Sequence, residues 1–130
     1  MEIIMHEGKT HAVIIRANFN AEGIKFFTPN DHSFQLGYMN RPKDYVIAPH
    51  LHKEIQRTIN TTSEVLFIKS GKIRVSFFDE SKNFLAHKTV SKGDILLLIS
   101  GGHGFEFLEQ GEIFEVKQGP YLGESEKERF

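Results

Sequence analysis

Short apolar or alternating runs, each closed by turn residues, limit most strongly what this chain can fold into. Residues 64–70 and 95–99 are largely apolar, and residues 72–78 alternate apolar with polar side chains. Alternation is typical of a β-strand with one buried face, and a short apolar run is typical of a strand in a core. Gly, Asn, Asp and Pro separate the runs, and no stretch has the periodicity of a three-turn amphipathic helix. The sequence therefore predicts an all-β fold of about ten short strands, a sandwich or barrel.

The length and composition predict a single domain, residues 1–130, of ordinary globular type. Hydrophobic residues make up 39% of the chain and charged residues 25%, which argues against a disordered or membrane protein. Sixteen basic and seventeen acidic residues leave a net charge of −1 without a basic cluster, so we expect no nucleic-acid partner. The chain has no cysteine and does not begin with a basic, apolar leader, so we expect a cytoplasmic protein without disulfides.

The expected strands place the core of the domain at about residues 33–118. Short N-terminal strands precede it, and a charged tail, residues 119–130, follows it. Because the apolar N-terminal strands and the free sheet edges need covering, we expect a homodimer. The runs predicted to form strands are residues 2–5, 12–16, 23–27, 33–40, 45–49, 64–70, 72–78, 84–90, 95–99 and 112–117, with one more strand after Gly101.

The stretch of residues 48–71 joins a pair of histidines to an acidic strand. His50 and His52 are two residues apart, so on a strand both imidazoles project from one face, about 7 Å apart. Two neutral imidazoles placed in this way can share one cation. Glu64 then opens an apolar run that ends at Gly71, a typical turn residue. From the residues alone, this stretch predicts a candidate metal site beside a β-hairpin.

These residues resemble the two sequence motifs of the cupin family. His50-x-His52 and Glu64-x6-Gly71 match parts of the first motif, and His103, preceded by two glycines, matches the histidine of the second. Eleven residues separate His52 from Glu64, a longer interval than in the family motif. The resemblance covers most of the chain and implies a double-stranded β-helix, the jelly-roll barrel of the cupins.

The resemblance also implies one divalent transition metal per chain, such as Zn, Mn, Fe or Ni, held by His50, His52 and His103 with a glutamate. The cupin motif gives Glu64 the place of the fourth ligand. Glu54 is the alternative, because it shares the strand parity of His50 and His52, whereas a simple hairpin would put Glu64 roughly 20 Å from His52. A metal-free pocket, whose histidines hydrogen-bond each other or a ligand, is the competing interpretation.

Three cations on predicted strands are candidates for binding an anionic substrate: Arg57, Arg74 and Lys117. Each of them is also compatible with a solvated strand face. Phenylalanines that face the interior of the barrel would give the pocket an apolar wall.

The end of the chain adds a functional expectation. Residues 115–121, with the charged tail, resemble the ending of small single-domain cupins associated with surface-polysaccharide and sugar-nucleotide pathways. The resemblance implies a metal-binding protein whose ligand or substrate is a small, polar, sugar-like metabolite. If the protein is an enzyme, the resemblance implies a metal-dependent isomerase, lyase or oxygenase. Two alternatives stay open: a metal-independent sugar-nucleotide isomerase or epimerase with a histidine as base, and a non-catalytic ligand-binding module.

Overall fold

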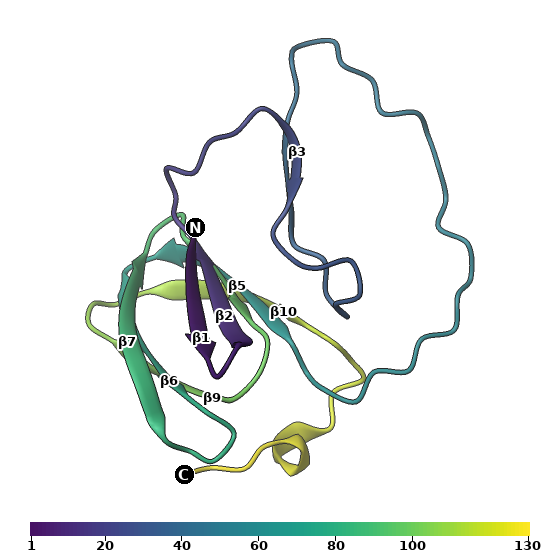
Figure 1. The fold of residues 1–130 in the computed structure, drawn as a ribbon. Coiled ribbons are helices and arrows are strands. Elements are labelled where there is room, and N and C mark those ends of the chain that lie inside the picture. Colours follow the sequence, from purple (N-terminus) through teal and green to yellow (C-terminus); the bar gives the residue numbers. More distant parts are fainter. The chain divides into compact units, whose positions relative to one another are not determined.

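The computed structural model describes all 130 residues and divides the chain into two units (Figure 1). The first unit comprises Met1–Phe19 and Thr61–Phe130, and the second comprises Asn20–Asn60. Apart from one short 3₁₀ helix, Gly123–Glu126, all regular structure is β-strand, which confirms the prediction of an all-β chain. No helix is long and apolar enough to span a lipid bilayer.

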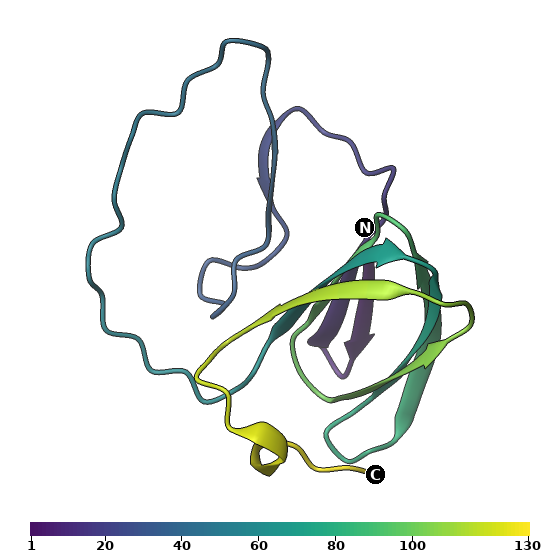
Figure 2. The same ribbon diagram turned by 180° about the vertical axis from the view of Figure 1, so that it is seen from behind.

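Two antiparallel sheets form the first unit (Figure 1 and Figure 2). The five-stranded sheet has the order β1-β2-β8-β5-β10, the three-stranded sheet has the order β7-β6-β9, and neither closes into a barrel. The strands of the first sheet are β1 (Glu2–His6), β2 (Lys9–Ile15), β5 (Glu64–Ser70), β8 (Ile95–Leu98) and β10 (Glu112–Lys117). Those of the second sheet are β6 (Lys72–Phe78), β7 (Phe84–Ser91) and β9 (Gly102–Phe107).

Side chains from both sheets form one hydrophobic core. Every second residue along β5 and β6 points into it, and Leu66, Ile68, Ile73, Val75 and Phe77 are at most 2% exposed. Burying a side chain of this size stabilises the fold by about 1.5–3 kcal/mol. The half-buried strand predicted from the alternation in β6 is confirmed.

The tight turn between β5 and β6 depends on Gly71. Its φ of 85° lies in the left-handed region, which residues with a side chain rarely adopt. A Cβ atom at this position would also approach the carbonyl oxygen of Gln110 to 2.6 Å. Glycine is therefore required here, in agreement with the turn predicted at the end of the apolar run.

A buried carboxylate fastens the turn between β7 and β8 to the N-terminal strands. Asp94 accepts hydrogen bonds from the backbone N–H groups of Ser91 (3.0 Å) and Ala17 (2.9 Å) and from the guanidinium of Arg16 (2.9 Å). Arg16 also pairs with Glu2 on β1, and this hydrogen bond raises the pKa of Arg16 and lowers the pKa of Glu2. The N-terminal strands are thus part of the main sheet.

The second unit contains one β-hairpin, in which β3 (Gly23–Phe26) pairs with β4 (Gly37–Asn40). The hydroxyl of Thr28 organises the loop between them. It donates to the side-chain oxygen of Gln35 (3.0 Å) and accepts from the backbone N–H of Leu36 (3.2 Å). This loop occupies the first half of the run that was predicted as a strand, so β4 begins later than expected.

Residues 41–60 follow β4 and contain no strand. All of them are exposed. The strand expected at residues 45–49 is therefore not formed in the chain, although its side chains have a strand-like pattern. A strand needs a hydrogen-bonded neighbour, and the pattern of one segment does not specify which neighbour that is.

Candidate functional site

Charged residues take the place of apolar ones at one end of the core. On β5, Glu64 has the same parity as the buried Leu66, and its register partner on β10 is Lys117. On the other sheet, His103 of β9 is the register partner of the core residue Phe77. Cross-strand partners share a face of the sheet, so Glu64, His103 and Lys117 all lie on the core side. These three residues are called the inner cluster below.

Glu64 and His103 form a contact between the two sheets. The Nε2 atom of His103 lies 3.3 Å from a carboxylate oxygen of Glu64, whose side chain is only 12% exposed. The hydrogen bond from His103 lowers the pKa of Glu64, burial opposes this effect, and the nearby charges of His103 and Lys117 lower the pKa further. Glu64 is therefore ionised at neutral pH and orients the imidazole ring of His103.

Three carboxylates surround the ammonium group of Lys117. Its Nζ atom lies 3.0 Å from Glu115, 3.8 Å from Glu126 and 3.9 Å from Glu64. The pKa of Lys117 is raised, mainly by its hydrogen bond with Glu115. Because three carboxylates face one ammonium, the site carries a surplus of negative charge.

Aromatic rings continue the inner cluster along β9. Phe105 and Phe107 lie on the same face as His103, opposite Val75 and Ile73 in the ladder. The ring centroids of Phe105 and His103 are 5.4 Å apart, and the two phenylalanines are 39% and 51% exposed. A few convergent polar groups beside accessible aromatic surface are typical of a small-molecule site.

The C-terminal segment, residues 118–130, follows β10 and includes the 3₁₀ helix (Figure 2), and it brings two more side chains to Lys117. The ring centroid of Tyr121 is 5.3 Å from the ammonium of Lys117, and Glu126 belongs to the 3₁₀ helix. Further along, Phe130 packs against Phe78, with 5.1 Å between the ring centroids. The charged tail therefore also supplies part of the wall of the site.

Three residues near Lys117 were not predicted from the sequence to belong to the site: Glu115, Tyr121 and Glu126. A usable signal existed for Glu115, because it is two residues from Lys117 on a predicted strand and so shares its face. Nothing in the sequence pattern of the tail indicates that Tyr121 and Glu126 return to the inner cluster.

The other predicted site residues lie elsewhere. His50 and His52 belong to the second unit, and their ring centroids are 5.5 Å apart, so the two imidazoles lie close together, although the strand on which they were predicted to lie is not formed. Glu54 and Arg57 are exposed residues of the same unit. Arg74 lies on the face of β6 that is turned away from the core and pairs with Glu106 on β9.

The structure contains no group of three or more His, Asp or Glu side chains arranged to hold a metal ion. In the first unit, Glu64 and His103 supply two donors, whereas a transition-metal site typically has three or four protein ligands. The centre formed by His50, His52, His103 and Glu64, with Glu54 as the alternative to Glu64, therefore stays a prediction.

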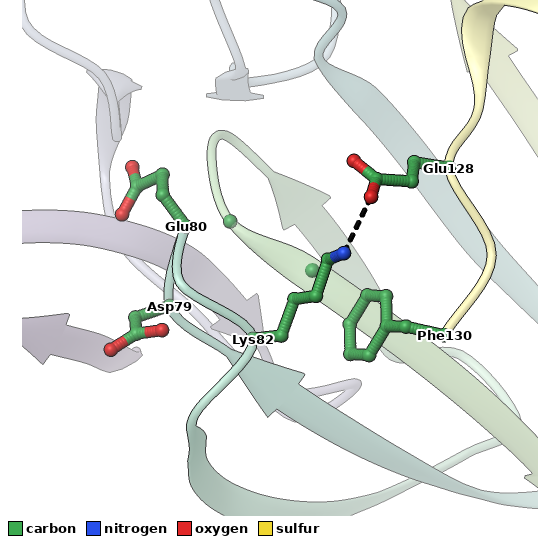
Figure 3. A pocket seen from close by; sticks show the side chains of 7 residues that line it. Asp79, Glu80, Lys82, Glu128 and Phe130 are labelled. Atoms are coloured by element: carbon green, nitrogen blue, oxygen red, sulfur yellow. Dashed lines mark hydrogen bonds and ion pairs between the residues drawn. The ribbon is translucent and has the colours of Figure 1, made fainter.

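A shallow hollow of about 270 Å³ lies beside the β6–β7 turn, and its polar groups already have partners. Figure 3 shows Lys82 reaching across it to Glu128 and Asp79 turned away from this pair. Asp79 accepts hydrogen bonds from the N–H groups of Ser81 (2.9 Å) and Asn83 (2.8 Å) within its own turn, and the bonds from Asn83 lower the pKa of Asp79. This hollow is a structural feature of the turn and the tail, so the inner cluster is the better functional candidate.

Comparison of the chain with protein-family models, with curated proteins and with solved structures found no match.

Proposed function

We propose that the inner cluster is a proton-transfer site for a small polar metabolite, in a protein of the cupin jelly-roll type. The observation that carries this proposal is the 3.3 Å contact between His103 and the buried carboxylate of Glu64. A histidine base is usually oriented by a third group of this kind. The reaction class that fits is isomerisation or epimerisation next to a carbonyl group, which a histidine base can perform by itself.

The contact assigns a role to each nitrogen of His103. Because the Nε2–H group donates to Glu64, the neutral imidazole carries its lone pair on Nδ1. Nδ1 would remove the proton from the carbon next to the carbonyl, and the electron pair of that bond would move onto the carbonyl oxygen as an enolate. Protonation of the same carbon on the opposite face, by water, gives an epimer. Where the proton-bearing carbon carries a hydroxyl group, transfer of the hydroxyl proton to the enolate oxygen and return of the carbon proton from Nδ1 to the former carbonyl carbon give an isomer. Lys117 is the cation available to stabilise the enolate oxygen.

The surroundings of the cluster favour a sugar-like substrate. Glu64, Glu115 and Glu126 can accept hydrogen bonds from hydroxyl groups, and the exposed rings of Phe105 and Phe107 can cover the apolar face of a sugar ring. The surplus of carboxylates argues for a substrate whose reacting part is uncharged.

Metal binding is the second candidate function. Two separate pairs of possible ligands support it, Glu64 with His103 in the first unit and His50 with His52 in the second, and all four side chains are of types that bind divalent transition metals. Elemental analysis of protein purified without a histidine tag tests it: close to one metal per chain, lost in His103→Ala, would favour this candidate. Metal-free protein that remains active would refute it.

Solvent deuterium exchange tests the proton-transfer proposal. The protein is incubated in D₂O with a panel of nucleotide-linked keto sugars, and the signal of the proton next to the carbonyl is followed by NMR. We expect His103→Ala to slow the exchange by about 100-fold or more. Lys82→Ala, which removes the ion pair in the hollow, is the matched control and should exchange like the wild type. Exchange in His103→Ala at the wild-type rate would refute the proposal, and binding without exchange would identify a non-catalytic module.

A further inference from the structure

The C-terminal segment, residues 118–130, passes from one sheet of the first unit to the other. It begins at the end of β10 in the five-stranded sheet, and Phe130 packs on β6 and β9 of the three-stranded sheet (Figure 2). The inner cluster lies at the same end of these strands, because Glu64 opens β5, Lys117 ends β10 and His103 is the second residue of β9. The segment therefore crosses the end of the two sheets where Glu64 and His103 meet.

Several interactions of the segment close within it. The backbone N–H of Lys127 donates to the carbonyl of Glu124 (3.1 Å), the hydroxyl of Ser125 donates to the carbonyl of Leu122 (2.6 Å), and Arg129 pairs with Glu124 (2.9 Å). No residue of its 3₁₀ helix is buried. A stretch with few buried contacts opens at a much lower free-energy cost than the core of a domain. The segment can therefore move while both sheets stay folded.

Two contacts hold the segment on the sheets. At the inner cluster, the carboxylate of Glu126 lies 3.8 Å from the ammonium of Lys117. At the other end, the ring of Phe130 packs edge-to-face on Phe78 and lies so close to Gly102 that a Cβ atom there would approach its Cζ atom to 2.6 Å. Gly102, which directly precedes His103 in the chain, thus forms the seat of the ring.

The contact at the far end is mainly apolar. Figure 3 shows Phe130 next to the ion pair between Lys82 and Glu128. Both members of this pair are exposed, and an exposed ion pair contributes little to stability. Breaking the ion pair should therefore leave the segment in place, whereas loss of the Phe130 ring should release it.

We propose that the C-terminal segment is a strap that closes the inner cluster and opens to admit a ligand, with Phe130 on Gly102 as its latch. In the closed state the carboxylate of Glu126 lies beside the ammonium of Lys117, the cation that the proposed mechanism assigns to the enolate oxygen. Glu126 and an oxygen of the substrate therefore compete for Lys117. This competition rests on the proposed function, whereas the strap and its latch do not.

Amine acetylation tests the strap without a ligand. The protein is treated with a small amount of the N-hydroxysuccinimide ester of acetic acid, and peptide mass spectrometry compares the labelling of Lys117 with that of Lys92, an exposed reference in the same chain. The side chain of Lys117 is only 19% exposed when the strap is closed. We expect Phe130→Ala to raise the Lys117-to-Lys92 labelling ratio about 5-fold or more, because opening becomes more frequent. Phe130→Leu, which keeps part of the apolar contact, should give an intermediate ratio.

A second variant releases the latch from the side of the sheet. Gly102→Ala places a methyl group where the tip of the Phe130 ring lies, so it should raise the labelling ratio as Phe130→Ala does. Gly104→Ala is the matched control, because it is two residues further along β9 and its Cβ atom meets nothing within 4 Å. Its labelling ratio should equal that of the wild type.

Two results would overturn the proposal. Labelling ratios that stay at the wild-type value in both Phe130→Ala and Gly102→Ala would show that Phe130 is not a latch. A ratio raised equally in Gly104→Ala would show a general loosening of β9 instead of an opening strap. Neither result bears on proton transfer at His103, which deuterium exchange measures separately, so the strap and the proposed function can fail independently.

Discussion

At the scale of single residues, Glu64 occupies a position that an apolar side chain would fill at lower cost. It continues the row of Leu66 and Ile68 on β5, and a carboxylate loses hydration when it is buried there. His103 and Lys117 offset this loss by a hydrogen bond and by opposite charge. A buried charge that is matched in this way, at the accessible end of a core, marks a candidate functional site.

The pKa of Glu64 predicts how stability depends on pH. It is lower in the folded protein than the ordinary value of 4.5, because of His103 first and the charges of Lys117 and Lys127 as well. A carboxylate with a depressed folded pKa stabilises the fold fully above its unfolded pKa and loses this effect as the pH falls through the folded pKa. The stability advantage of the wild type over Glu64→Gln should therefore be constant near neutral pH and shrink below about pH 4.5. Urea unfolding at a series of pH values measures it, and an advantage that grows on acidification would contradict the assignment.

At the scale of elements, most strands could be predicted because their pattern and their turns agree. The alternation in β6 predicts a half-buried strand, and the glycine before it, Gly71, predicts a turn at its start. The structure confirms both. The prediction of a strand at residues 45–49 was wrong. A segment with the side-chain pattern of a strand still needs the edge of another strand to pair with. The late start of β4 has a local cause, the hydrogen bonds of the Thr28 hydroxyl.

The β5–β6 turn gives a prediction at this scale. Gly71→Ala adds a side chain at a positive φ and a Cβ atom 2.6 Å from the carbonyl oxygen of Gln110. The backbone strain alone costs on the order of 1–3 kcal/mol. Gly104→Ala is the control, because a Cβ atom there meets nothing within 4 Å. Thermal unfolding should show a clearly lower midpoint for Gly71→Ala only, and equal midpoints would show that the turn can relax.

At the scale of the whole molecule, two residues that resemble the cupin motifs belong to the candidate site. Glu64 and His103 were selected because they match the motifs, and Lys117 was selected as a cation on a strand; the structure brings these three together. Glu126 and Tyr121 could not be predicted, because their contacts with Lys117 depend on the path of the tail. The complete four-ligand metal centre stays a prediction, since His50 and His52 belong to the second unit.

In the proposed mechanism, Glu64 orients His103 so that Nδ1 is the basic nitrogen. NMR of ¹⁵N-labelled imidazoles tests this most directly, since it distinguishes a protonated ring nitrogen from an unprotonated one. At a pH where His103 is neutral, we expect its proton on Nε2, and we expect Glu64→Gln to abolish this preference. Glu128→Gln, which changes a carboxylate outside the inner cluster, should leave the spectrum of His103 unchanged. A proton on Nδ1 of His103 in the wild-type protein would contradict the account.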